Sequence, residues 1–304
     1  INGAAPYYSL NMQEENARNT FEALFCYMGE ELGQMKTRVN NWTLGNELNS
    51  CNAWNYAGSM SFNEYVANYA EAFKMLHQAV RRTAASPRLF ISLDHCWNVA
   101  EAGYSGRAFL DTFASYMNQT APDMQWNVNF HSYSQPLSNN RFWNDRWNTT
   151  DDVSTRYISM RNISVLTNYL SSLEQTYGKT QGSIRVIIGE LGYSATKGGA
   201  ESEQAAALGY GYYIAMANKR IDSYIIRAYV DDSTEAASGL YLGLNANWGY
   251  HVKKEAYEVY KYLDRNQSFD YMNRYLGMIG IGSWESAIPG FNADEIRAGE
   301  KMFQ

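Results

Sequence analysis

The sequence predicts an α/β fold built on parallel strands, and three observations lead to this prediction. Short apolar segments with strand patterning alternate with longer segments in which apolar residues recur at helical spacing, the order typical of parallel α/β folds. The 304 residues fit one large domain of this class. Polar side chains follow the ends of five strands, and in a (β/α)8 barrel that end of the strands carries the functional groups.

The expected helices and strands alternate along most of the chain. Apolar residues at helical spacing predict helices at residues 15–35, 62–85, 106–118, 160–177, 201–219 and 252–264. Short apolar runs predict strands at residues 38–46, 88–94, 125–131, 184–190 and 222–229. We find no internal repeat, low-complexity tract or linker. We therefore expect residues 1–304 to form a single domain, with residues 268–304 as a C-terminal helical tail.

The composition excludes some partners and favours others. The net charge is −6, the isoelectric point is near 5.3 and the basic residues do not cluster, so a nucleic-acid partner is not expected. No apolar run approaches the roughly 18 residues of a membrane span. The 25 Tyr, 8 Trp and many Asn suit a neutral carbohydrate, because aromatic faces stack on sugar rings and amides bind hydroxyls. A compositional bias of the lineage would produce the same counts.

Neither the cysteines nor the histidines predict a metal site. Cys26, Cys51 and Cys96 lack metal-ligand spacing, and the four histidines form no zinc pair. No phosphate loop, dinucleotide fingerprint or nucleophile elbow occurs, so we expect neither a cofactor nor a metal. Cys51 and Cys96 each follow a strand end, so a disulfide bond between them is possible. Two free thiols are favoured over this alternative. The chain as given begins without a signal peptide, which a processed secreted protein also lacks, and we expect a secreted protein.

Two glutamates stand at the ends of apolar strands. Glu47 lies in the run Asn41–Asn49, and Glu190 closes the run Val186–Glu190. A charged group at the end of an apolar strand is unfavourable unless it faces a site. Glycoside hydrolysis needs two such carboxylic groups, one to protonate the departing oxygen and one to attack the sugar carbon. The structural alternatives are an ion pair between Glu47 and Arg38, and a turn capped by Glu190.

The motif Gly45-Asn46-Glu47 after one strand, with Glu190 ending a later one, resembles the clan A (β/α)8 retaining glycoside hydrolases. The runs 91–98 and 126–133, with 142–145, look most like a poorly characterised bacterial family of clan-A-like barrels. The resemblance covers residues 1–265 and implies that residues 38–46 are the fourth barrel strand and 184–190 the seventh. It implies that Glu47 is the acid/base, Glu190 the nucleophile and Asn46 a contact to the sugar hydroxyl next to the reacting carbon.

Further residues near the strand ends are candidates for substrate binding. They are Asp94, His95, Trp97, His131, Tyr133, Trp143 and Arg227. His131 and Tyr133 alternate, so their side chains point to the same side. The resemblance implies that such a tyrosine can hydrogen-bond the nucleophile. Arg227 could instead pair with Glu190 or Asp231. Sugar-stacking candidates follow strands at Trp54, Trp97, Trp143, Trp147 and Trp248, although most of such a set will be packing residues.

Too few residues precede the first predicted strand to hold three βα units. We therefore expect a TIM-type (β/α)8 barrel that lacks its first three strands in this chain, with the fourth and eighth strands at the edges. A second polypeptide would supply the missing strands. The expected function is a retaining glycoside hydrolase acting on a polysaccharide or oligosaccharide. The alternative is a non-catalytic carbohydrate-binding protein on a degenerate barrel.

Overall fold

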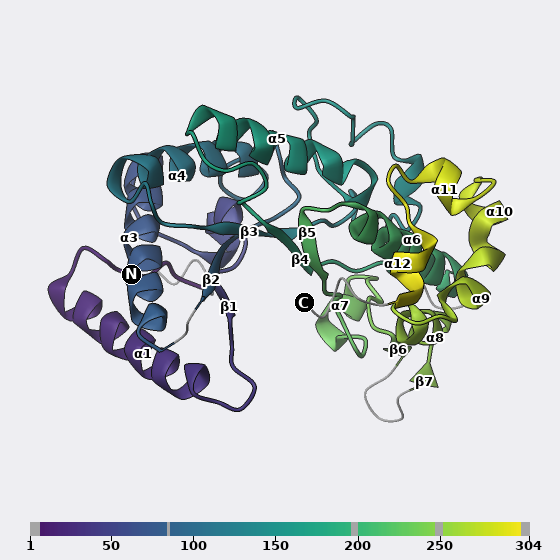
Figure 1. Cartoon of the computed structure of the whole chain (residues 1–304), viewed down its shortest axis with the longest axis horizontal. Helices are drawn as coiled ribbons and strands as arrows, with labels where there is room; N and C mark the ends of the chain where they lie inside the picture. Colours follow the sequence, from purple (N-terminus) through teal and green to yellow (C-terminus); the bar gives the residue numbers. More distant parts are fainter. Residues whose placement is uncertain (1–6, 84–85, 196–199, 247–251, 299–304) are drawn as a thin grey trace. The chain divides into compact units, whose positions relative to one another are not determined.

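The structure is a computed structural model that describes residues 7–83, 86–195, 200–246 and 252–298. Its main sheet has five parallel strands in the order β1-β2-β3-β4-β5 (Figure 1). The strands are β1 (Asn41–Leu44), β2 (Arg88–Leu93), β3 (Asn127–His131), β4 (Val186–Glu190) and β5 (Ile221–Tyr224). The five expected parallel strands are therefore confirmed, with β1 and β5 at the ends of the order. Within the described residues the sheet does not close into a barrel.

The chain divides into two compact units. Unit 1 comprises residues 1–129 and 170–185, and unit 2 comprises residues 130–169 and 186–304. The chain passes between the units within β3, within helix α5 (Ile163–Thr176) and just before β4. The expectation of one domain over residues 1–304 stays a prediction.

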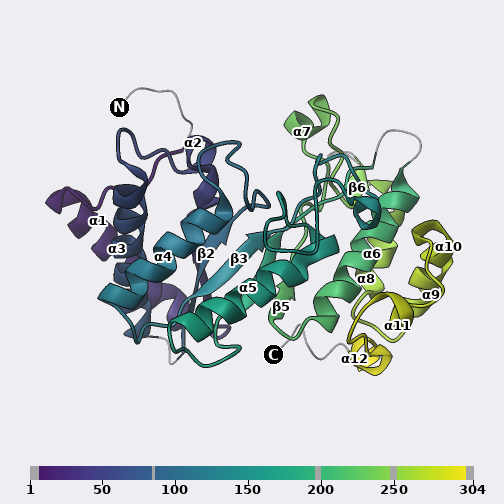
Figure 2. The same ribbon diagram turned by 90° about the horizontal axis from the view of Figure 1, so that it is seen from above.

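In unit 1 three long helices accompany β1 and β2. They are α1 (Glu15–Gly33), α3 (Phe62–Arg81) and α4 (Gly106–Thr120), and α3 lies against both α1 and α4 (Figures 1 and 2). Helix α3 begins at a capping box in which Ser61 and Glu64 bond each other's backbone amides, which satisfies two free amides of its first turn. Its apolar face is buried as predicted, and Tyr69 and Phe73 pack against Phe113 of α4, the Phe73 ring in an edge-to-face arrangement.

Unit 2 is built around α6 (Glu201–Ala217), which is buried on nearly every side and packs against α8 (Glu255–Tyr262). A Cβ on Gly209 would lie 2.1 Å from the sulfur of Met272, so only glycine allows α9 (Ser268–Met272) to approach so closely. The described tail, residues 268–298, is helical as expected. Its remaining elements are η4 (Asn273–Tyr275), α10 (Leu276–Ile279), α11 (Trp284–Ala287) and α12 (Ala293–Ala298).

Several predicted boundaries are wrong. The first strand covers Asn41–Leu44 rather than residues 38–46, and the helix expected at residues 62–85 ends at Arg81. The fifth strand ends at Tyr224 rather than at residue 229, and the closing helix begins at Glu255 rather than at residue 252. Residues 252–253 form β7, which pairs antiparallel with β6 (Asn245–Ala246) instead of continuing the helix. Short elements that the sequence did not predict follow several strands. They are η1 (Leu48–Ser50), α2 (Cys51–Trp54), η2 (Phe142–Asn144), η3 (Met160–Asn162) and α7 (Ser233–Ala237).

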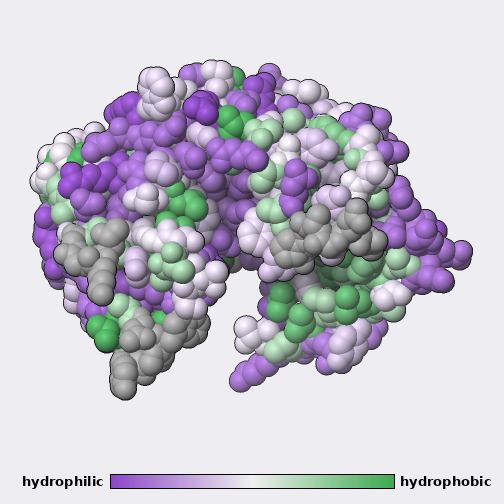
Figure 3. Space-filling model, turned by 180° about the vertical axis from the view of Figure 1, so that it is seen from behind, coloured by the Kyte–Doolittle hydropathy of each residue, from purple (hydrophilic) through white to green (hydrophobic). Residues whose placement is uncertain are grey.

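The surface mixes polar and apolar side chains. On the face shown in Figure 3, green hydrophobic residues reach the surface among purple hydrophilic ones. Exposed apolar side chains include Leu24 and Met35 of unit 1 and Ile225 of unit 2. All three cysteines are free, which excludes the bond between Cys51 and Cys96. No helix among the described residues has both the length and the apolarity needed to cross a membrane.

Candidate active site

Glu47 lies three residues after the end of β1, in a strained backbone conformation. Its φ of 44° and ψ of 60° are left-handed, and it is the one non-glycine residue with positive φ in the part of the chain that the structure describes. This conformation costs an L-residue on the order of 1–2 kcal/mol. Such outliers persist only where the surroundings enforce them, and they cluster at functional sites. The strain therefore singles out the glutamate that the strand pattern had selected.

Hydrogen bonds from neighbouring segments hold the Glu47 backbone in place. Its amide donates to Oγ of Ser92 on β2 at 3.0 Å, and its carbonyl accepts from the Ser50 amide at 2.8 Å. The Asn55 side chain donates to the carbonyl of Asn46. The turn begins at Gly45, where φ is 77°, and a Cβ there would lie 2.9 Å from the Leu48 side chain. The sequence therefore fixes the position from which the half-buried Glu47 side chain leaves the backbone.

Asp94 fastens the segment after Glu47 to the end of β2. Its carboxylate accepts hydrogen bonds from Asn49 Nδ2 at 2.5 Å, from the Ser50 hydroxyl, and from the Cys96 amide at 2.7 Å. Asn49 Oδ1 in turn accepts from the Asp94 amide at 3.0 Å. Asp94, predicted as a substrate contact, thus orders the loop that carries Glu47. His95 is also buried, and Trp97 is completely buried, so neither face of its ring is open to solvent.

Asp94, His95 and Cys96 have potential ligand atoms within 4.8 Å of one another. Metal binding requires the thiolate. Burial, followed by the charges of Asp94 and Glu101, raises the pKa of the Cys96 thiol, which keeps the proton on sulfur. The Asp94 oxygens already accept three hydrogen bonds.

In unit 2, Glu190 ends β4 and pairs with a tyrosine. The hydroxyl of Tyr133, two residues beyond β3, donates to Glu190 Oε1 at 2.7 Å. A hydrogen bond to a carboxylate is short and stronger than one between neutral groups, so it fixes the direction in which the carboxylate points. This contact was implied by the resemblance. His131, at the end of β3, is almost completely buried.

Arg227 follows β5 and has its own acidic partner. Its Nε lies 2.6 Å from Oε1 of Glu235 on α7. Burial opposes the charge of the guanidinium, but the hydrogen bond to Glu235 and the charges of Glu235 and Glu190 raise the pKa of Arg227. Asp231, which the sequence offered as a partner of Arg227, instead forms a buried ion pair with Lys254 at 2.7 Å.

The predicted tryptophans occupy different environments. Trp143 is buried, and its ring packs against Phe142 and Tyr210. Trp147 is 84% exposed and Trp54 is 38% exposed. Trp248 lies outside the described residues.

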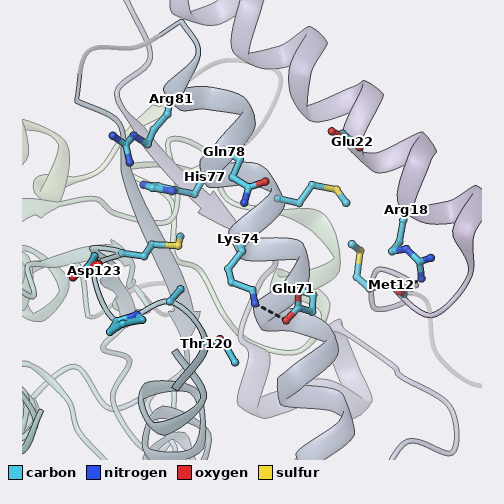
Figure 4. A pocket seen from close by; sticks show the side chains of 14 residues that line it. Met12, Arg18, Glu22, Glu71, Lys74, His77, Gln78, Arg81, Thr120 and Asp123 are labelled. Atoms are coloured by element: carbon cyan, nitrogen blue, oxygen red, sulfur yellow. Dashed lines mark hydrogen bonds and ion pairs between the residues drawn. The ribbon is translucent and has the colours of Figure 1, made fainter. Parts of the chain in front are cut away.

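Unit 1 contains a pocket of about 870 Å³ (Figure 4). It is lined by side chains of α1, α3 and residues 120–124, which precede β3. Lys74 and Glu71, which face each other in Figure 4, form an ion pair at 2.6 Å. Burial and the neighbouring Arg81 lower the pKa of His77, which favours its neutral form. Because the amino-terminal end of barrel strands serves stability rather than catalysis, we do not assign this pocket to the predicted chemistry.

The sequence analysis did not identify several residues that hold the candidate site residues in place. Ser92 could have been found, because it alternates with Asp94 along β2 and points to the same side. Asn49, Asn55 and Glu235 carry no signal of their own, since each is recruited from a loop or short helix by tertiary contacts.

Comparisons with known proteins give a family and a fold. The sequence matches a family described as a family of unknown function, DUF5722, over residues 1–287. No curated protein matches the chain. One similar solved structure is GH5_18 from Streptomyces cattleya in complex with GlcNAc, at a TM-score of 0.52 and 12% identity over 80% of this chain and 52% of that one.

A second similar structure is a monomeric beta-xylosidase from Caulobacter crescentus CB15, at a TM-score of 0.50 and 14% identity. That match covers 82% of this chain and 46% of the other, so this chain spans about half the length of both structures. Both are TIM-barrel glycosidases. The expected likeness to barrel glycoside hydrolases is therefore confirmed for the fold, and identities this low show the fold alone.

Proposed function

We propose that this chain, which belongs to the DUF5722 family, is a retaining glycoside hydrolase acting on a polysaccharide or oligosaccharide. The observation that carries the proposal is Glu47, a carboxylate held in strained left-handed backbone at the end of a parallel strand. The fold shared with TIM-barrel glycosidases supports it, because such barrels carry their catalytic groups at that end of the strands. Glu190, oriented by Tyr133, supplies the second carboxylate.

The proposed reaction has two displacements at the anomeric carbon. First, a Glu190 oxygen attacks that carbon, the bond to the leaving oxygen breaks, and Glu47 gives its proton to that oxygen. Glu47 then takes a proton from water, and the resulting hydroxide attacks the same carbon and releases Glu190. Two inversions leave the configuration of the sugar unchanged, and neither step requires a metal or a cofactor.

The other predicted residues would bind or orient the sugar. Asn46 would hydrogen-bond the hydroxyl next to the reacting carbon, a contact that strengthens in the transition state. Tyr133 would keep one oxygen of Glu190 occupied so that the other is directed at the sugar. His131, Trp143 and Arg227 of unit 2 would contact the substrate. Asp94, His95 and Trp97 would support the loop after Glu47.

The test is the stereochemistry of hydrolysis. A panel of polysaccharides screened for released reducing ends identifies a substrate, and proton NMR during the first minutes shows which anomer forms before mutarotation. We expect the product to keep the configuration of the substrate. Release of the opposite anomer would establish an inverting reaction, and a panel without any released ends would favour the carbohydrate-binding alternative.

We further propose that another polypeptide pairs with β1 and β5, the end strands of the sheet. Unpaired edges present free backbone groups that proteins normally cover. In the isolated chain, amides of β1 and β5 that point away from the sheet should exchange with deuterium much faster than those of β2. Hydrogen exchange followed by mass spectrometry measures this difference. Slow exchange along both end strands in the chain alone would show that these edges are already covered.

A further inference from the structure

Unit 1 presents a group of aromatic side chains to solvent close to the Glu47 loop. The exposed fractions are 53% for Tyr7, 43% for Tyr8 and 38% for Trp54. Burying a large apolar side chain contributes roughly 1.5–3 kcal/mol, and these rings forgo part of that gain. We call Tyr7, Tyr8, Trp54 and Tyr56 the aromatic platform. Gathered exposed aromatic rings, in contrast to single ones, indicate a surface that binds something.

The aromatic platform is held by main-chain hydrogen bonds. Tyr8 and Tyr56 form a parallel β-bridge, in which the Tyr56 amide donates to the Tyr7 carbonyl and the Ser9 amide to the Tyr56 carbonyl, both at 3.1 Å. The rings of Tyr7 and Trp54 have centroids 5.3 Å apart, and those of Tyr8 and Tyr56 are 6.1 Å apart. The rings are therefore ordered before any ligand binds, which lowers the entropic cost of binding.

A pocket of about 440 Å³ adjoins Tyr8 and Tyr56, and its lining is neutral. Its polar side chains are hydroxyls and amides, from Ser9, Asn11, Gln13 and Ser59, and no charged side chain lines it. An ionic ligand would find no counter-charge there. A neutral sugar unit matches both features, because its C–H face stacks on an aromatic ring and its hydroxyls bond to amides and hydroxyls.

The aromatic platform and the Glu47 turn belong to one short stretch of chain. Helix α2, which ends in Trp54, begins four residues after Glu47, and the Asn55 side chain donates to the carbonyl of Asn46. A sugar unit bound at the aromatic platform would thus be held at a defined position relative to the segment that carries Glu47. We propose that the aromatic platform binds a sugar unit of an extended neutral polysaccharide at a distance from the bond to be cleaved. The link to cleavage rests on the proposed glycosidase function, whereas the binding does not.

Affinity electrophoresis tests the platform. Native gels would contain mixed-linkage β-glucan, xylan, glucomannan or galactomannan, and the polymer that retards the wild-type chain most is used. We expect Trp54→Ala to raise the dissociation constant about tenfold and Tyr7→Ala, which disturbs no core, to raise it severalfold. Tyr27→Ala is the matched control, because Tyr27 is a 62% exposed tyrosine of the same unit on α1. That control should migrate like the wild type.

Kinetics separate this inference from the proposed function. For the hydrolysed polymer, kcat/KM relative to that of an aryl glycoside should fall about tenfold in Trp54→Ala. If no polymer retards the wild type, or if Trp54→Ala and Tyr7→Ala are retarded as strongly as it is, the platform does not bind glycans. If retardation depends on Trp54 but the wild type hydrolyses nothing, the glycosidase proposal is wrong and the proposal that the aromatic platform binds a sugar unit is supported.

Discussion

Replacing Glu190 by alanine is expected to lower kcat on an activated aryl glycoside by on the order of 10⁴ or more, because the covalent intermediate can no longer form. The fold should survive, since Glu190 is half-buried at the end of β4 and its hydrogen bond from Tyr133 can be replaced by water. Steady-state kinetics and the midpoint of thermal unfolding measure the two effects. Glu258→Ala is the control, because Glu258 is a partly exposed glutamate of the same unit that forms an ion pair with Lys253.

Azide reports which role each glutamate has. In Glu190→Ala, azide enters the space of the carboxylate and attacks the anomeric carbon directly, so the glycosyl azide has the opposite configuration to the substrate. In Glu47→Ala the intermediate on Glu190 still forms from a substrate with a good leaving group. Azide then displaces Glu190, and the product keeps the substrate configuration. Full activity of Glu190→Ala without azide would exclude Glu190 as the nucleophile.

The strands were predictable because buried parallel strands are continuous apolar runs. Arg88–Leu93 and Val186–Glu190 were placed to within two residues, since nearly all of their side chains are buried. The same criterion, a continuous apolar run, predicted a fifth strand that is too long. Residue Ile225 extends the apolar pattern but is 47% exposed, so apolarity there does not indicate a strand. The start of the closing helix was misplaced because Val252 and Lys253 are recruited by β6, a pairing that helical spacing does not reveal.

The two candidate carboxylates could be predicted from the sequence. The residues that hold the candidate site residues in place could not. A glutamate that ends an apolar strand stands out in any sequence, and Glu47 and Glu190 were found in that way. The partner of Arg227 was not, because Glu235 is brought to it by α7, a helix of five residues without a clear pattern. Asp94 has a structural role that the sequence did not reveal, while its predicted contact with substrate stays a prediction. Its carboxylate carries three hydrogen bonds that build the loop after Glu47.

Stability is expected to fall steeply above pH 10, because several buried tyrosines must keep their protons in the folded state. Burial raises the pKa of Tyr65, Tyr69, Tyr193 and Tyr224 above the ordinary value near 10. Three of these hydroxyls also donate to backbone carbonyls. Tyr65 donates to Leu48 at 2.9 Å, Tyr69 to Leu44 at 2.9 Å and Tyr224 to Leu208 at 3.0 Å. A phenolate cannot make these bonds, so ionisation favours the unfolded chain.

The direction of the effect follows from proton linkage. Above pH 10 the unfolded chain loses these protons and the folded chain retains them, so the free energy of unfolding decreases as the pH rises. Each tyrosine contributes about 1.4 kcal/mol per pH unit, and four together contribute roughly 5–6 kcal/mol per unit. Burial lowers the pKa of Lys254, which acts in the opposite direction between that lowered pKa and 10.5, but it is a single group. The tyrosines therefore determine that the free energy of unfolding decreases as the pH rises.

Urea unfolding between pH 8 and pH 11, followed by circular dichroism, measures this slope. Tyr69→Phe in unit 1 and Tyr224→Phe in unit 2 keep the buried ring and remove the proton, so each should reduce the slope by about 1.4 kcal/mol per pH unit. Tyr27→Phe should leave it unchanged, because Tyr27 is 62% exposed. A free energy of unfolding that stays constant from pH 9 to pH 11 would mean that these tyrosines ionise without unfolding. The hydrogen bonds from these hydroxyls to the end of β1, to η1 and to α6 would then not contribute to the stability of the folded chain.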